Sequence, residues 1–361
     1  MPETIPHPQD PLAEPRRIAS LDAARAIAAL LVVCQHSFET FVPSIPKSFA
    51  ILNLGQVGVV CFFLISGFVI PYSLQSHGSL LKYAISRVFR IFPLYWAVLM
   101  ITCFLLWLRI PVLGHDAMNA LSWRSFAVHI FMIQSLFKIP NMVGISWTLV
   151  IEMVFYFVTA FVFLIKPSSL LRLIVLSCCL VLGASLLGFH FHKSLPIYPA
   201  ALILTAFAGQ AVEYQWSGRI TRLQARVILI VILLTCLVSI AIREACLPYD
   251  ISTRTVCVSW IGGYATFLVM LATRGKSNAA SFLGRISYST YLLHPLIITL
   301  LFYYFHASWM LIIACFIGTV AAATLTFDWI EQPGIAIGKS LFKKILRART
   351  GQPSFSRQPV A

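Results

Sequence analysis

The sequence predicts an all-α fold, a polytopic integral membrane helical bundle with about ten transmembrane helices. Of its 361 residues, 59% are hydrophobic and only 11% are charged, and the mean hydropathy is +0.86. A soluble domain is nearer half apolar and about a quarter charged. Apolar runs of about 20 residues, the length that crosses a bilayer as a helix, recur along the whole chain.

Ten apolar runs are the expected spans. They are 20–42, 54–75, 90–110, 146–165, 170–189, 197–214, 226–243, 256–273, 286–305 and 308–329. Residues 119–138 are also apolar, but Arg124, His129 and Gln134 interrupt them. We therefore expect a re-entrant or surface-lying helix there instead of a further span.

The chain is expected to divide into three parts. Residues 1–17 hold five prolines and no apolar run, so they predict a disordered cytoplasmic N-terminus rather than a cleavable signal peptide. The transmembrane domain is expected to cover 18–333. Residues 334–361 are rich in Lys and Arg and predict a basic, solvated cytoplasmic tail.

Positive charge predicts the orientation. With the N-terminus inside, 19 of the 27 Lys and Arg fall on the inner side and 7 on the outer side, while Arg25 lies within the first span. Positive residues gather in cytoplasmic loops, so both termini are predicted to be cytoplasmic. The net charge of +15 is then explained by the inner loops and does not indicate nucleic acid as a partner. The nine cysteines show no CxxC or Cys/His ligand spacing, so no metal site is expected.

The first span, LDAARAIAALLVVCQHSFETF, carries Arg25 and His36. Eleven residues make about three helical turns, so both lie on one face about 16 Å apart. Asp22 and Glu39 extend this stripe at both ends. Because ionisable groups within a span usually face a cavity or the bundle interior, the stripe predicts a polar cavity. Snorkelling of Arg25, a structural role for His36, and either an interface or an orienting role for Glu39 stay open.

Two more segments place charge inside or beside the membrane. Glu152 in SWTLVIEMVFY lies about 9 Å from the outer end of its span, at a depth similar to that of His36. The two are a candidate proton-handling pair, and pairing of Glu152 for helix assembly is the alternative. Arg87 and Arg90 in RVFRIFPLYW are one turn apart at the inner boundary, where an anionic cofactor would arrive. Ordinary positive-inside enrichment explains them equally well.

Uncharged polar residues add candidates for the cavity wall. Ser66 in GVVCFFLISGF is one, although close helix packing also explains the small residues of that segment. In GRISYSTYLLHPL the hydroxyl and imidazole side chains recur on one face, where they either line the same cavity or bond to a neighbouring helix. The candidate cavity-lining residues are Ser66, Ser146, Trp147, Ser287, Tyr291 and His294.

Together and in this order, these segments resemble the membrane-bound acyltransferase 3 family, the bacterial integral-membrane O-acyltransferases. The resemblance runs from about Leu21 to Pro333. The segments that carry it are the Arg25–His36 pair, FFLISGF, RVFRIFPLYW, SWTLVIE, ISYSTYLLHPL and the closing Glu331–Gln332–Pro333. The chain has alanines near Arg25, at Ala23 and Ala26, where the family often has glycines.

The resemblance implies an acyltransferase of groups other than amino-acyl groups, an O-acetyltransferase first of all, in the bacterial inner membrane. The co-substrate would be acyl-CoA, most simply acetyl-CoA, bound from the cytoplasm by Arg87 and Arg90 without a metal. The acceptor would be a hydroxyl of a cell-surface or lipid-linked carbohydrate or a glycolipid, as in polysaccharide modification. His36, Arg25 and Glu152 would be the catalytic residues.

A transporter or flippase that uses the same polar cavity is the alternative function. The absence of visible internal repeats and of paired broken helices in the sequence weighs against it. The sequence also lacks a GxSxG nucleophile elbow, which weighs against a serine hydrolase.

Overall fold

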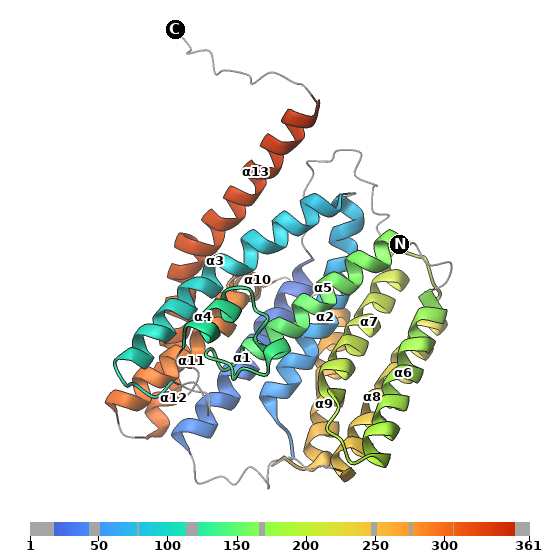
Figure 1. Cartoon of the computed structure of the whole chain (residues 1–361), viewed down its shortest axis with the longest axis horizontal. Helices are drawn as coiled ribbons and strands as arrows, with labels where there is room; N and C mark the ends of the chain where they lie inside the picture. The colour runs from blue at the N-terminus through green and yellow to red at the C-terminus, as the bar shows by residue number, and fades with distance from the viewer. Residues whose placement is uncertain are drawn as a thin grey trace.

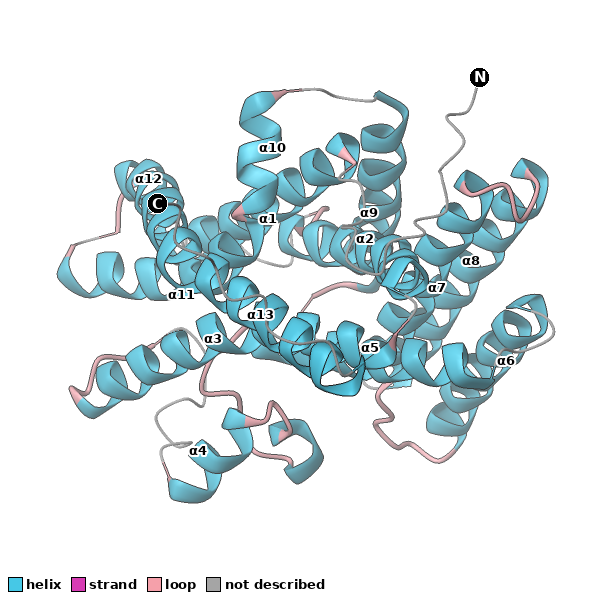
Figure 2. Cartoon of the chain, turned by 90° about the horizontal axis from the view of Figure 1, so that it is seen from above, coloured by secondary structure: helices cyan, strands magenta, loops and turns pink. Residues whose placement is uncertain are grey.

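The computed structural model describes residues 18–42, 51–77, 79–112, 122–165, 170–246, 251–273, 277–305 and 307–350. Within these ranges every regular element is a helix, and no strand occurs among them. The long helices run roughly side by side (Figure 1) and form a single bundle when seen from above (Figure 2). The predicted all-α fold is confirmed.

Each of the ten expected spans is a long helix. They are α1 (Ala19–Phe41), α2 (Leu54–His77), α3 (Leu80–Trp107), α5 (Ser146–Ile165), α6 (Leu170–His190), α7 (Ile197–Trp216), α8 (Arg222–Cys246), α9 (Thr253–Thr273), α11 (Ser287–Tyr304) and α12 (Trp309–Thr326). By length and apolar composition, the described residues hold 8 candidate spans, or 9 when α11 is counted with the short helix before it. The remaining expected span, α7, buries two strongly polar residues, Gln210 and Glu213. The protein is therefore a multi-pass membrane protein.

α3 begins ten residues earlier than the expected span at 90. Ser79 caps its N-terminus by accepting a hydrogen bond from the backbone N–H of Lys82. This side-chain cap satisfies one of the orphan donors of the first turn, so the helix forms well before its apolar part begins.

The closest helix contact joins α2 and α7 through a reciprocal pair of glycines. A Cβ on Gly67 would collide with the backbone carbonyl of Ala206, and a Cβ on Gly209 would collide with that of Leu64. Glycine lets two backbones approach where any side chain would hold them apart. The packing explanation of the small residues near Ser66 is therefore correct for Gly67.

The segment predicted not to span the membrane forms α4 (Trp123–Ile130) and the short 3-10 turn η3 (Gln134–Phe137). An eight-residue helix is about 12 Å long, too short to cross a bilayer. Figure 2 shows α4 at the edge of the bundle. The prediction that 119–138 is not a further span is confirmed for its described residues.

His129 fastens this segment. The side chain is fully buried; its Nδ1 lies 2.7 Å from the carbonyl oxygen of Ser125, and its Nε2 accepts a hydrogen bond from the backbone N–H of Met142 at 3.0 Å. Burial lowers the pKa of His129, because the charged imidazolium would lose its hydration.

Two short elements complete the inner ends of the bundle. α10 (Asn278–Arg285) meets α11 at a bend of 66°. It packs against the first turn of α1, where a Cβ on Gly284 would collide with the backbone of Asp22. After α12 a π-helical turn, η4 (Phe327–Glu331), leads directly into α13 (Gln332–Thr350).

α13 corrects the expectation of a solvated tail from 334. As far as Thr350 this stretch is a helix packed along α3 (Figure 1). A Cβ on Gly334 would lie 2.7 Å from the carbonyl oxygen of Phe89, so two small residues one turn apart, Gly334 and Gly338, allow the close packing. The expected disordered start at 1–17 and the remainder of the tail, 351–361, lie outside the described residues.

Candidate active site

A cavity lies among α1, α2, α3, α5 and α11. It holds about 860 Å³ of space free of protein atoms, the open solvent at its mouth included. Its charged and polar lining residues are Arg25, Ser66, Arg87, Arg90, Thr148, Glu152, Tyr156, Ser287, Tyr288 and Tyr291. The rest of the wall is apolar and consists of Val59, Phe62, Phe63, Ile65, Val69, Ile70, Ile91 and Leu149.

Arg25 faces this cavity from α1. One of its guanidinium nitrogens lies 3.1 Å from a carboxylate oxygen of Asp22, one turn earlier. Asp22 is itself buried, because α10 covers the first turn of α1. The stripe predicted from the sequence therefore exists at this end, and Arg25 contributes its charge to the cavity wall.

Glu152 is the carboxylate of the cavity wall. Ser66 donates a hydrogen bond to it at 3.2 Å, and Tyr156, one turn further along α5, donates another at 2.7 Å. The expected pairing with His36 is not among the contacts of the described residues. Depth along two helix axes did not predict the lateral neighbours, since α2 packs against both α1 and α5.

Arg87 lies on the opposite wall, between aromatic rings. Its guanidinium carbon is 5.7 Å from the centre of the Tyr83 ring and 5.6 Å from that of Tyr156, distances at which cation–π attraction operates. Its Nε is buried without a hydrogen-bond partner among the described residues. The aromatic clamp fixes the group, and the free donor stays available for a ligand.

Arg90 completes the cationic wall and faces a carboxylate that the sequence analysis had not assigned. Its Nη2 lies 4.0 Å from Oε1 of Glu331, whose side chain is fully buried. The other oxygen of Glu331 accepts a hydrogen bond from Ser289 at 3.0 Å. The π-helical turn ends at Glu331 and brings it into the bundle.

Positive charge dominates the lining. Three guanidinium groups and one carboxylate line the cavity, and the carboxylates of Asp22 and Glu331 contact two of the three from behind. In surroundings of low dielectric constant, charges act more strongly on a ligand than they do in water. The cavity is therefore suited to an anion that carries an apolar or amphipathic arm.

His36 lies outside the cavity lining as the described residues define it. Its side chain is 36% exposed, and its Nδ1 lies 3.2 Å from a carboxylate oxygen of Glu39. The His36 ring is nearly parallel to that of His294, with 5.4 Å between the ring centres and 17° between the planes. The second half of the predicted stripe is thus a histidine held between a carboxylate and a second imidazole.

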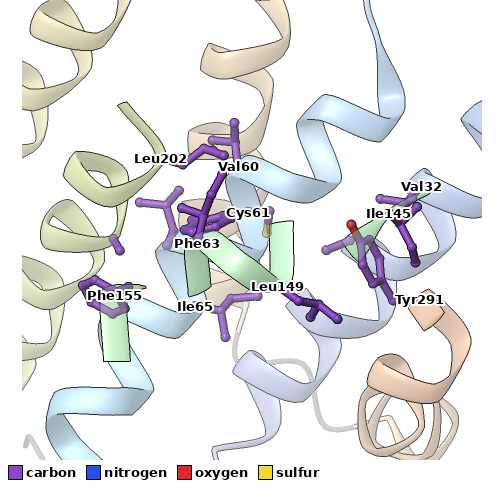
Figure 3. Close-up of a cluster of buried hydrophobic side chains, with 14 of the residues drawn as sticks. Val32, Val60, Cys61, Phe63, Ile65, Ile145, Leu149, Phe155, Leu202 and Tyr291 are labelled. Atoms are coloured by element: carbon purple, nitrogen blue, oxygen red, sulfur yellow. The ribbon is translucent and has the colours of Figure 1, made fainter. Parts of the chain in front are cut away.

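Tyr291 and His294 of α11 separate His36 from the cavity. The Tyr291 hydroxyl lies 2.7 Å from that of Thr148 on α5, which closes this end of the cavity. Figure 3 shows the Tyr291 ring beside Val32 of α1 and Ile145, all three of them buried. We call Tyr291 and Thr148, with these apolar neighbours, the partition.

The remaining candidates divide between the cavity and other surroundings. Ser66, Ser287 and Tyr291 line it as predicted. Ser146 instead bonds to Asn141 and Gln134 at the start of α5, and the neighbouring Trp147 is 38% exposed. Neither belongs to the described lining.

Three lining or supporting residues were missed in the sequence. Tyr156 was detectable, because it lies four residues after Glu152 and therefore on the same face of α5. Tyr288 donates its hydroxyl to the backbone carbonyl of Ile91, a contact between distant segments without a local signal. Glu331 was part of the closing motif but had been given no role.

The comparison with protein families agrees with this arrangement. The family model described as an acyltransferase domain matches residues 18–328, which includes every helix that lines the cavity. No curated protein and no solved structure matches the chain at a significant level. Because the match covers most of the sequence, the chain belongs to the acyltransferase 3 family and is a membrane acyltransferase.

Proposed function

We propose that the protein is an O-acyltransferase of the bacterial inner membrane. It moves an acyl group, most simply acetyl, from cytoplasmic acyl-CoA to a hydroxyl of a cell-surface or lipid-linked carbohydrate. Both termini then lie in the cytoplasm, in accord with the distribution of Lys and Arg. The observation that carries this proposal is the convergence of Arg25, Arg87 and Arg90 on one cavity with apolar walls.

The cavity suits the donor. Coenzyme A is a polyanion with a long, mostly uncharged arm that ends in the thioester. Guanidinium groups bind phosphate oxygens through paired, charge-assisted hydrogen bonds, and Arg87 has a donor nitrogen to offer. The apolar wall formed by α2, α3 and α5 accommodates the arm and the acyl group.

Glu152 belongs to the donor side. Its bonds to Ser66 and Tyr156 join α2 to α5 across the cavity, and Tyr156 in turn packs on Arg87. The carboxylate therefore holds the wall that grips the donor and does not orient His36, the role first expected of it.

His36 acts as the general base. A carboxylate only accepts hydrogen bonds, so the contact with Glu39 places the imidazole hydrogen on Nδ1 and leaves Nε2 bare. Nε2 takes the proton of the acceptor hydroxyl while its oxygen attacks the thioester carbonyl carbon. The carbon–sulfur bond then breaks, and coenzyme A leaves as a thiolate that regains the proton. Such proton transfer is worth about 10²–10⁴-fold in rate.

The partition adds a requirement. The thioester arrives on the cavity side of Tyr291, and His36 stands on the other. Transfer therefore needs the Tyr291–Thr148 hydrogen bond to open so that the acyl end can pass.

Purified protein in lipid nanodiscs, supplied with radiolabelled acetyl-CoA and with membrane glycans as acceptors, tests the proposal. We expect covalently labelled glycan and released coenzyme A, both abolished in His36→Ala. Movement of label across proteoliposomes without a covalent product would favour the transporter alternative. Full activity of a well-folded His36→Ala variant would remove His36 from the mechanism.

A further inference from the structure

We propose that His294 is a positioning residue for the acyl transfer. It holds the ring of His36 in place and accepts a hydrogen bond from it once His36 carries the acceptor proton. The inference rests on the proposed function, in which His36 is the general base. It starts from the contact between the two rings and from a nitrogen of His294 that has no partner among the described residues.

The tautomer of His294 is fixed by its backbone contact. Its Nδ1 lies 2.6 Å from the carbonyl oxygen of Tyr291. A carbonyl oxygen only accepts, so the hydrogen of the neutral imidazole lies on Nδ1, and Nε2 carries a lone pair. The ring thus presents an acceptor and no second donor.

That acceptor is buried and unused. The His294 side chain is 0% exposed, and its Nε2 makes no hydrogen bond within the described part of the chain. Buried polar atoms nearly always have a partner, and an exception calls for an explanation. A partner that becomes a donor only during the reaction provides one.

His36 is the neighbour that changes in this way. At rest its Nδ1 is engaged with Glu39, the one charged side chain among its printed contacts. When Nε2 takes the acceptor proton, the imidazole becomes a cation with two donors. The adjoining ring of His294, 5.4 Å away between centres and nearly parallel, offers its lone pair to that new donor after a small change of side-chain torsion.

The role predicts an effect on the chemical step and not on donor binding. The cavity arginines lie on the far side of the partition formed by Tyr291, so a change at His294 leaves them in place. Stabilising protonated His36 lowers the barrier of the step in which it gains the proton. A histidine that merely fills space would change protein stability and leave the kinetics of the folded fraction alone.

Three substitutions separate these possibilities. His294→Ala removes the ring and the lone pair, His294→Gln restores an amide oxygen near the position of Nε2, and His294→Asn reaches only the position of Nδ1. Thr299→Val, a substitution of similar size at a buried position of the same helix, controls for general disturbance of α11. Each variant is assayed with acetyl-CoA as donor and methyl α-glucoside at high concentration as the hydroxyl probe, per mole of folded protein.

We expect His294→Ala to lower kcat at least tenfold while the KM for acetyl-CoA stays within twofold. His294→Gln should recover more of kcat than His294→Asn does, and Thr299→Val should resemble the wild type. Unchanged kcat in His294→Ala, a loss confined to KM, or equal recovery by Asn and Gln would overturn the inference. If His294→Ala does not fold, the comparison of Gln with Asn decides.

His36→Ala, run in parallel, tells the two hypotheses apart. When it retains wild-type transfer, the proposed function of His36 fails and the inference about His294 fails with it. When it is inactive but all His294 variants match the wild type, only the inference about His294 fails.

Discussion

Removing one hydroxyl from the partition should uncouple thioester cleavage from transfer. In the folded protein, Thr148 donates its hydrogen to the carbonyl oxygen of Ile145 at 3.0 Å. The Tyr291 hydroxyl is therefore the donor in its 2.7 Å contact with Thr148. In Tyr291→Phe this bond is lost, while Thr148 keeps its own bond to the backbone.

The magnitude follows from one buried hydrogen bond. Such a bond contributes about 1 kcal/mol net, which corresponds to a change of about fivefold in an equilibrium between closed and open partition. Water then reaches the thioester more often. We expect the release of coenzyme A from acetyl-CoA, without any acceptor, to rise by up to about fivefold.

The assay follows free thiol in nanodiscs, and Thr205→Val is the matched control. Thr205 accepts a hydrogen bond from Trp260 at 3.1 Å between α7 and α9, away from the cavity lining. That variant should lose a similar amount of stability without a rise in hydrolysis. Unchanged hydrolysis in Tyr291→Phe would refute the partition, and an equal rise in the control would show general loosening of the bundle instead.

Three further predictions concern the donor site, the packing and the outer segment. The double substitution Arg87→Ala with Arg90→Ala should raise the KM for acetyl-CoA about 10–100-fold, because hydrogen bonds to charged groups contribute about 1.5–3 kcal/mol each; an unchanged KM contradicts this. Gly67→Val should destabilise the bundle by about 1–3 kcal/mol or more through overpacking, seen as a lower melting temperature, whereas Gly183→Ala, where an added Cβ meets nothing within 4 Å, should not. His129 has a lowered pKa in the folded protein, so the folded state binds fewer protons than the unfolded one, and stability is lost as the pH falls below the unfolded value of about 6.5. Hydrogen exchange in 122–143 should accelerate below that pH, and His129→Gln should abolish this dependence.

The helices and half of the site were predictable because their signals are local. Apolar length alone placed the ten spans, and spacing alone placed Arg25 on a polar face of α1. The convergence of Arg87, Arg90 and Glu152 on one cavity agrees with the face on which each lies in its own helix.

Lateral packing is what the sequence did not reveal. Glu152 and His36 were matched by depth, but α2 packs against both of their helices and the partition closes the cavity before His36. α13 was mistaken for a solvated tail, because its basic residues masked the small and apolar positions that pack on α3. Glu331 faces inward after a π turn, which has no recognisable sequence pattern in this chain.

Between Trp309 and Ala348 the chain is one uninterrupted helical rod of 40 residues. At 1.5 Å per residue it measures about 60 Å, roughly twice the hydrocarbon thickness of a bilayer. The π turn sits near the middle of this rod, and the carboxylate at its end faces Arg90. A twist applied at the distal tip, by a fused domain or a binding partner, would be felt at the guanidinium that grips the donor, so a label attached to the amino end is the safer choice for kinetic work.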